Sequence, residues 1–299
     1  MKGAVLLVLK IFAFVLCRSG FSAEECSFVD VDGKRLLQVS QGVSCYLTAG
    51  TYDAWGFDVN GTLEVRRPST SSVAILNLQA VNTIRVGSAG KIVSDATGYE
   101  AREGPGAGNA YGSGAGHGGR GGHRSYALLT STESLSYGNV YVPHEVGSGG
   151  GGTCGGAGGG AIYLRANVSV VIDGVLSVNG GDASTGNQCG GGSGGSILIE
   201  TDYIIGSGFL AARGGKGHQG GGGGAGGRIS FKYRVSSFVG ESIADGGVAG
   251  SSESQLGILS MFSSSSYNTS FSATYGNLDY STIRSWRSST TDTIPWLEA

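Results

Sequence analysis

Proline, charged residues and long apolar runs are all scarce in this chain of 299 residues. It contains 4 prolines, and charged residues make up only 14% of it. The low proline content excludes collagen, which combines glycine at every third position with abundant proline. Beyond the first 23 residues, no stretch reaches the ~20 apolar residues of a membrane-spanning helix, so we expect no membrane span in the mature chain.

Glycine is abundant instead, with 58 residues, about one in five, against a usual ~7%. Glycine costs roughly 1 kcal/mol per helical position relative to alanine, which argues against an ordinary helical enzyme. Hydrophobic residues still make up 39%, including 13 Tyr, 10 Phe and 3 Trp. The chain therefore has the material for a core and is not a low-complexity linker.

Residues 1–23 have the layout of a secretory signal peptide. Lys2 supplies the charged start, residues 4–16 are almost entirely apolar, and the small residues Ser22 and Ala23 suit cleavage. A transmembrane anchor is the alternative. Cleavage would leave 17 basic residues against 22 acidic ones, a net charge of −5. We therefore predict a secreted, extracellular protein, and this charge balance does not indicate a nucleic-acid partner.

Four cysteines remain after cleavage, namely Cys26, Cys45, Cys154 and Cys189. An even number of cysteines in an exported chain predicts disulfides. Three sequons begin at Asn60, Asn167 and Asn268, and each is a candidate glycosylation site if the host is eukaryotic.

The glycine-rich part of the sequence contains a repeat of about 30 to 35 residues. Four segments begin with glycine and place apolar residues at their third and fifth positions; they start at Gly160, Gly195, Gly227 and Gly257. An earlier relative begins at Ala74. A second half of each unit begins at Gly174, Gly208 and Gly240, always six residues before a Gly-Gly pair. Alternation of this kind lines one face of a strand.

Units of this size cannot bury an apolar face alone, but stacked units cover one another. The repeat therefore predicts an all-β fold, a parallel β-solenoid (β-helix-like) with glycine-rich loops. A β-sandwich with regularly spaced strands is the alternative. The glycine tracts themselves are either disordered loops or tightly packed extended segments, and the sequence leaves this open.

The cysteines provide a test of this register. Cys154 and Cys189 each lie six residues before the leading glycine of neighbouring units. Stacking would place their Cα atoms roughly 5 Å apart, within the range that disulfides require. We therefore predict a Cys154–Cys189 bond, with Cys26–Cys45 closing an N-terminal loop.

The organisation that we expect has four parts. A signal peptide (1–23) precedes an N-terminal cap and first coil (24–72). Repeats then occupy residues 73–262, with an insertion at about 99–159, and a Ser/Thr-rich cap or tail completes the chain (263–299).

Motif matches in so glycine-rich a chain carry little weight. The spaced glycines from Gly114 to Gly119 lack the strand, helix and acidic partner of a dinucleotide site. Ser193 sits in a literal nucleophile-elbow pattern, but a strand follows it where that motif needs a helix. His117 and His123 share a loop downstream of Glu100 and Glu103, without the ligand spacing of a metal site. We predict no metal, no cofactor and no catalytic residue.

Carboxylates in neighbouring units are candidate catalytic groups, because enzymes that act on polysaccharides use paired carboxylates. Asp173 and Asp202 lie in adjacent units. Equivalent positions of three successive units hold Asn179, Arg213 and Asp245. Stacking of the units would place these side chains in one outward row, which is a possible ligand-binding edge. A solvated polar corner explains the same row.

The forms Gly-Gly-x-Ile-x-Ile, Gly-x-Leu-x-Ala-x-Gly-Gly and Gly-Gly-Ala-Gly-Gly-Arg-Ile, between Gly149 and about Phe262, resemble a known repeat. It is the glycine-rich repeat of large exported or cell-surface proteins of plants and protists and of some bacterial surface proteins. The resemblance implies a β-helix-like surface or matrix protein without assigned chemistry.

Three functions therefore stay open. The first is a secreted, non-enzymatic structural or adhesive protein whose partners are extracellular matrix, polysaccharide or copies of itself. The second is a carbohydrate-binding module, with Trp55, Trp286 and Trp296 as sugar-stacking platforms. The third is a polysaccharide-cleaving enzyme, suggested by fold analogy alone.

Overall fold

The computed structural model describes residues 24–109, 111–123 and 134–249, together with the backbone of three later strands. The predicted signal peptide (1–23), the sequon at Asn268 and most of the tail at 263–299 lie outside the described residues. Within the described part the chain forms two sheets and no helix, and no segment there could cross a membrane as a helix.

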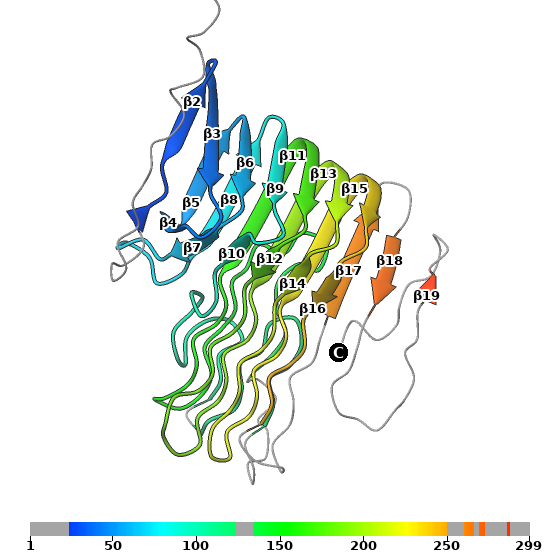
Figure 1. Ribbon diagram of the computed structural model, residues 1–299. Coiled ribbons are helices and arrows are strands. Elements are labelled where there is room, and N and C mark those ends of the chain that lie inside the picture. Colours follow the sequence, from blue (N-terminus) through cyan, green and yellow to red (C-terminus); the bar gives the residue numbers. More distant parts are fainter. Residues whose placement is uncertain are drawn as a thin grey trace, which may run out of the picture.

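The first sheet has seven strands, all paired in parallel (Figure 1). In spatial order they are β1 (Glu24–Glu25), β4 (Ser44–Thr48), β7 (Thr62–Arg66), β10 (Lys91–Val93), β12 (Val175–Ser177), β14 (Phe209–Ala211) and β16 (Glu241–Ile243). These strands are short, and β12, β14 and β16 each lead directly into a glycine-rich stretch.

The second sheet has twelve strands and packs against the first across the core. They are β2 (Phe28–Val31), β3 (Lys34–Val39), β5 (Gly50–Ala54), β6 (Gly56–Val59), β8 (Ile75–Ala80), β9 (Thr83–Val86), β11 (Ala161–Ile172), β13 (Ser196–Gly206), β15 (Arg228–Phe238), β17 (Ser260–Ser265), β18 (Thr269–Ser272) and β19 (Trp286–Arg287). Pairing is parallel except between β2 and β3, β17 and β18, and β18 and β19. The antiparallel pairs thus lie at the two ends of the sheet.

The register inferred from the repeat is confirmed for the units that begin at Ala74, Gly160, Gly195 and Gly227. It is wrong by two residues for the unit at Gly257, because Ile229 pairs with Met261 and not with Leu259.

Ile162 of β11 lies between Leu76 of β8 and Ile197 of β13, and Ile197 pairs with Ile229 of β15. Each of these four side chains is at most 1% exposed, and together they form one column of the core. A fully buried aliphatic side chain contributes about 1.5–3 kcal/mol, so such columns hold the two sheets together.

Both disulfides have the predicted pairing. Cys154 and Cys189 bond across neighbouring repeats, with Cα atoms 5.4 Å apart, and Cys26 bonds Cys45 at 5.1 Å. The second bond ties the N-terminal β1 region to β4. The two pairs are consistent with an extracellular protein, since such bonds persist in oxidising compartments.

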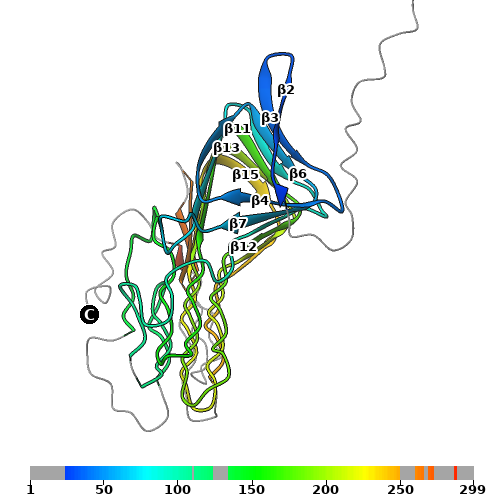
Figure 2. The same cartoon turned by 90° about the vertical axis from the view of Figure 1, so that its left-hand side faces the viewer.

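Each repeat leaves the sheets for a glycine-rich stretch, and these stretches run alongside one another below both sheets (Figure 2). Residues 190–195 show how they pack. The first and fourth N–H groups of this segment donate to carbonyls in 147–151, the second and fifth to 221–225, and the third and sixth to 178–181, over 2.8 to 3.0 Å. A period of three residues is that of a polyproline-II-type helix. Residues 190–195 therefore form such a helix with three backbone-bonded neighbours.

We call the segments 147–160, 178–195 and 212–227 the glycine bundle. Its members approach so closely that a side chain would collide with a neighbouring backbone; a Cβ on Gly192, for example, would overlap the carbonyl of Ala157. The tracts that the sequence left undecided are thus packed extended segments.

The expectation of a parallel β-solenoid was wrong, and so was the β-sandwich alternative. The structure is a layered β fold of two mostly parallel sheets, continued by the glycine bundle. It is not a regular solenoid, because glycine helices replace the turns that would close each coil and antiparallel strands occur at both ends of the larger sheet. It is not a β-sandwich, because that fold requires antiparallel sheets.

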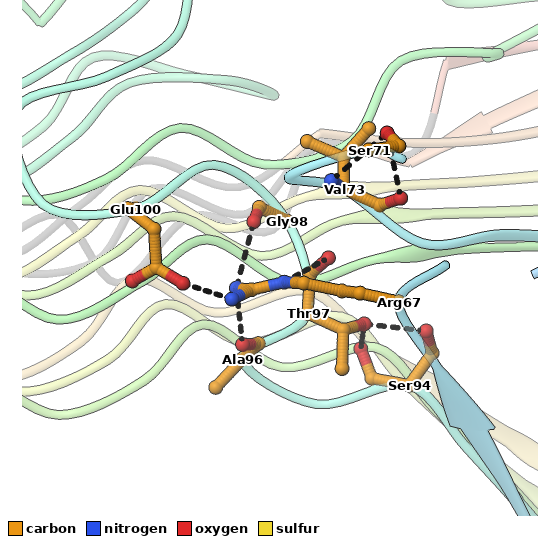
Figure 3. Close-up of polar contacts among 8 residues, drawn as sticks. All are labelled: Arg67, Ser71, Val73, Ser94, Ala96, Thr97, Gly98 and Glu100. Atoms are coloured by element: carbon orange, nitrogen blue, oxygen red, sulfur yellow. Dashed lines mark hydrogen bonds and ion pairs between the residues drawn. The ribbon is translucent and has the colours of Figure 1, made fainter. Parts of the chain in front are cut away.

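The insertion expected at 99–159 begins close to an arginine anchor (Figure 3). Arg67 follows β7, and its guanidinium donates to the carbonyl oxygens of Ala96, Thr97 and Gly98 at 2.9 to 3.2 Å. It also forms an ion pair with Glu100. One planar, multidentate group thus fixes the chain where it leaves β10 and enters the glycine-rich region.

We expect Gly192→Ala to lower the free energy of unfolding by about 1–3 kcal/mol, because the added methyl overpacks a backbone contact. Chemical denaturation followed by circular dichroism measures the change. Gly33→Asn is the matched control, since Gly33 has open space and a φ of 73° that Asn tolerates. Equal stabilities for the two variants would contradict the close packing of the bundle.

Candidate functional site

A groove lies on the outer face of the second sheet where β3, β6 and β9 meet. Alternate residues of these strands point into the core, including Leu37, Phe57 and Ile84, which are at most 2% exposed. The residues between them face outward. The register pairs Gln38 with Asp58 and Asp58 with Arg85, so outward side chains from three strands form a row.

Gly56 lines the groove at an outward position of β6. It pairs with Leu36 of β3, and a Cβ on Gly56 would lie 3.5 Å from Leu36 Cδ2 and 3.0 Å from the carbonyl oxygen of Thr83, so a larger residue would press on both neighbours. The groove has a volume of about 390 Å³. This volume falls at the lower end of the ~300–1,000 Å³ typical of ligand sites. We call it the Gly56 groove.

Trp55 lines the groove from the corner between β5 and β6. Its backbone N–H donates to Arg35 O at 2.7 Å, and its own carbonyl accepts from Asn82 N at 2.9 Å. Lys34 Nζ lies 4.4 Å from the centroid of the indole ring. The backbone bonds place Trp55 and Asn82 side by side, and the ammonium group of Lys34 packs over the indole ring.

Arg85 lines the groove next to Asp58 and is held by two bonds. Its Nη1 donates to Asp58 Oδ1 at 3.1 Å and to Asn60 Oδ1 at 3.0 Å. Asn60 Nδ2 donates in turn to Asp58 Oδ1 at 2.9 Å. These bonds orient the guanidinium and the carboxylate before any ligand arrives.

Sequence reasoning found part of this site. Of the three tryptophans singled out, Trp55 is in the groove, whereas the Trp286 side chain and Trp296 lie outside the described residues. Asp58, Asn82 and Arg85 were missed. Buried and outward-facing residues alternate at 56–59 and at 83–86, which places Asp58 and Arg85 outward and could have revealed them. The repeat described above does not extend to residues 56–59.

The row of Asn179, Arg213 and Asp245 lies together along the glycine bundle, as the slots indicated. Arg213 N donates to Asn179 Oδ1 at 2.7 Å, and Gly214 N donates to Asp245 O at 2.8 Å. Arg213 and Asp245 are exposed. Asn179 therefore has a structural bond within the row, and the two charged side chains remain accessible to a ligand.

The carboxylates considered for catalysis also have structural partners. Asp173 Oδ1 accepts from Ser207 N at 3.2 Å, and Asp202 Oδ2 lies 3.3 Å from Arg234 Nη2. Asp95 plays a similar part in the bundle, where its Oδ1 accepts from Asn179 N at 2.6 Å. Side-chain oxygens of one repeat thus satisfy outward N–H groups of the next.

Two of the three sequons can be placed. Asn167 is exposed on β11, at the register shift between Ala166 and Ser169. Asn60 is partly buried, and its amide bonds Asp58 and Arg85 beside the groove. Of the two, Asn167 has the more accessible amide.

The histidine loop does not gather ligands around a metal. His117 is fully buried, its Nδ1 lies 2.7 Å from Gly194 O, and its ring stacks on Tyr137 with centroids 4.7 Å apart. Glu100 is engaged by Arg67 instead. Among the described residues no three His, Cys, Asp or Glu side chains form a group that could hold a metal ion.

We expect the protein to lose stability as pH falls from about 6.5 towards 3. The pKa of His117 is lowered to about 3, chiefly because the ring is buried; the hydrogen bond to Gly194 opposes this shift and the positive charge of Arg228 adds to it. An unfolded histidine takes up its proton near pH 6.5, so below that pH only the unfolded state gains it. The free energy of unfolding then falls by up to ~1.4 kcal/mol per pH unit, and this contribution is fully present above pH 6.5.

Denaturation curves between pH 7 and pH 4 test this dependence. His117→Gln removes the titrating group, so the stability difference between wild type and variant should shrink as the pH falls. Curves that stay parallel over this range would show that His117 is not the group responsible.

Comparisons of the chain with protein-family models, curated proteins and solved structures found no match. The functional argument therefore depends on the chain's own geometry.

Proposed function

We propose that the protein is exported and acts outside the cell as an adhesive or structural protein that binds matrix polysaccharide. The observation that carries the proposal is the exposed, preorganised groove at one end of a rigid body. Backbone hydrogen bonds and two disulfides hold that body together, which suits a protein that transmits load between a partner and a surface.

An extracellular location is supported by two features. The disulfides form at the predicted pairs, and residues 1–23 have the composition of a secretory signal. The exposed Asn167 sequon suits the same compartment.

A role in polysaccharide cleavage is less well supported than a role in binding. The carboxylates of Asp173 and Asp202 are used in contacts between repeats. A carbohydrate-binding module is the second candidate, and Trp55 in the groove favours it.

Co-sedimentation of the purified mature protein with insoluble polysaccharides tests the proposal. We expect the protein to pellet with at least one polymer and to remain in the supernatant without polymer. Arg213→Ala should weaken pelleting if the row of Asn179, Arg213 and Asp245 contacts the polymer. It should leave pelleting unchanged if this row is only solvated surface. A wild-type protein that pellets with no polymer in a broad panel would contradict a matrix-binding role.

A further inference from the structure

We propose that the Gly56 groove binds a short stretch of an uncharged polysaccharide chain, with Trp55 stacking on a sugar ring and Asp58, Asn82 and Arg85 bonding its hydroxyls. This inference rests on the proposed function, because it names the part of the surface and the class of polymer that matrix binding would use. Four observations lead to it.

The shape of the groove suits a polymer passing over the sheet. It is open, and its floor is the side-chain-free position at Gly56 between Leu36 and Thr83. A small molecule is usually enclosed on most sides, with 70–90% of its surface buried. A chain that crosses an open groove needs only one side of each ring covered.

The aromatic ring suits a sugar. A hexopyranose presents C–H groups on one face and hydroxyls around its rim, so it stacks on an aromatic face and hydrogen bonds at its edge. Trp55 lines the groove, with Lys34 Nζ 4.4 Å from the centroid of its ring, so an aromatic surface is part of the groove wall. The backbone of Trp55 is anchored by hydrogen bonds at both its N–H and its carbonyl, and the indole has only two side-chain torsions, so little entropy is lost on binding.

The polar groups suit hydroxyls. Asn82 and Gln38 offer an amide donor and acceptor each. Arg85 donates to Asp58 and Asn60 through Nη1 alone, and Asp58 accepts from Arg85 and Asn60 through Oδ1 alone. Within the described part of the chain, the second carboxylate oxygen and the other guanidinium N–H groups are thus left for a ligand. Adjacent hydroxyls, which both donate and accept, match such a mixed set.

The charges suit an uncharged polymer. Two acidic and two basic side chains line the groove, Asp32 and Asp58 with Lys34 and Arg85. They sum to zero, so an acidic chain gains no net electrostatic attraction in the groove, and binding there depends on stacking and on hydrogen bonds that a neutral chain makes equally well.

The test is co-sedimentation of wild type and variants with cellulose and chitin, which are uncharged, and with cross-linked pectate, which is acidic. We expect wild type to pellet with an uncharged polymer. Trp55→Ala should weaken the apparent affinity roughly tenfold or more, because a stacking contact and its buried area are lost. Trp55→Tyr, which keeps an aromatic face, should recover most of it.

The matched control is Tyr46→Ala. Tyr46 also lies beneath a cation, with Arg66 Cζ 3.8 Å from its ring centroid, but it belongs to β4 in the other sheet. It should pellet like wild type. Circular dichroism and thermal unfolding of every variant identify any loss that comes from misfolding, and Asn82→Ala provides a second groove variant that removes no buried side chain.

The outcomes separate the two proposals. If wild type pellets and both Trp55→Ala and Asn82→Ala pellet equally well, the groove is not the binding site, although matrix binding stands. If wild type pellets with pectate alone, the inference of an uncharged polymer is wrong and the adhesive role again stands. If wild type pellets with no polymer, both proposals fail.

Discussion

The structure depends on hydrogen bonds between backbones that have no side chains between them. In the glycine bundle, residues 190–195 form a three-fold helix whose successive N–H groups point to three different neighbours. An isolated glycine strand loses more conformational entropy on ordering than any other sequence. The bundle is therefore stable only as a set, and its order must come from the elements at which its segments begin and end.

Those elements are the two sheets. The core columns that contain Ile162, Ile197 and Leu176 fix the spacing of the repeats, so each glycine segment enters the bundle about one strand spacing from the last. The Cys154–Cys189 bond ties neighbouring repeats inside the bundle, beyond the reach of the core. Hydrophobic burial thus positions the sheets, and backbone bonding extends that order into a region that consists mostly of glycine.

The sequence predicts the part of this arrangement that side chains encode. Apolar residues at fixed distances from a glycine reveal the paired slots, and cysteines in equivalent slots reveal the disulfides. It does not reveal the bundle, because glycine carries no pattern that distinguishes a packed helix from a free loop. The expected solenoid therefore had the right register in all but the unit at Gly257, and the wrong architecture.

The groove escaped prediction for a different reason, which lies in the corners of the repeats. Between paired positions, the chain runs from Ala54 to Phe57 in three steps but from Ala80 to Ile84 in four. This one-residue difference hides the alignment of Trp55 with Asn82, although backbone bonding places them together. Strand interiors must stay in register to keep the core buried, whereas corners can vary at little cost. The groove takes Trp55 and Asn82 from such corners and Asp58 and Arg85 from the strands beside them, so its ligand can change at the corners while the scaffold beneath it remains the same.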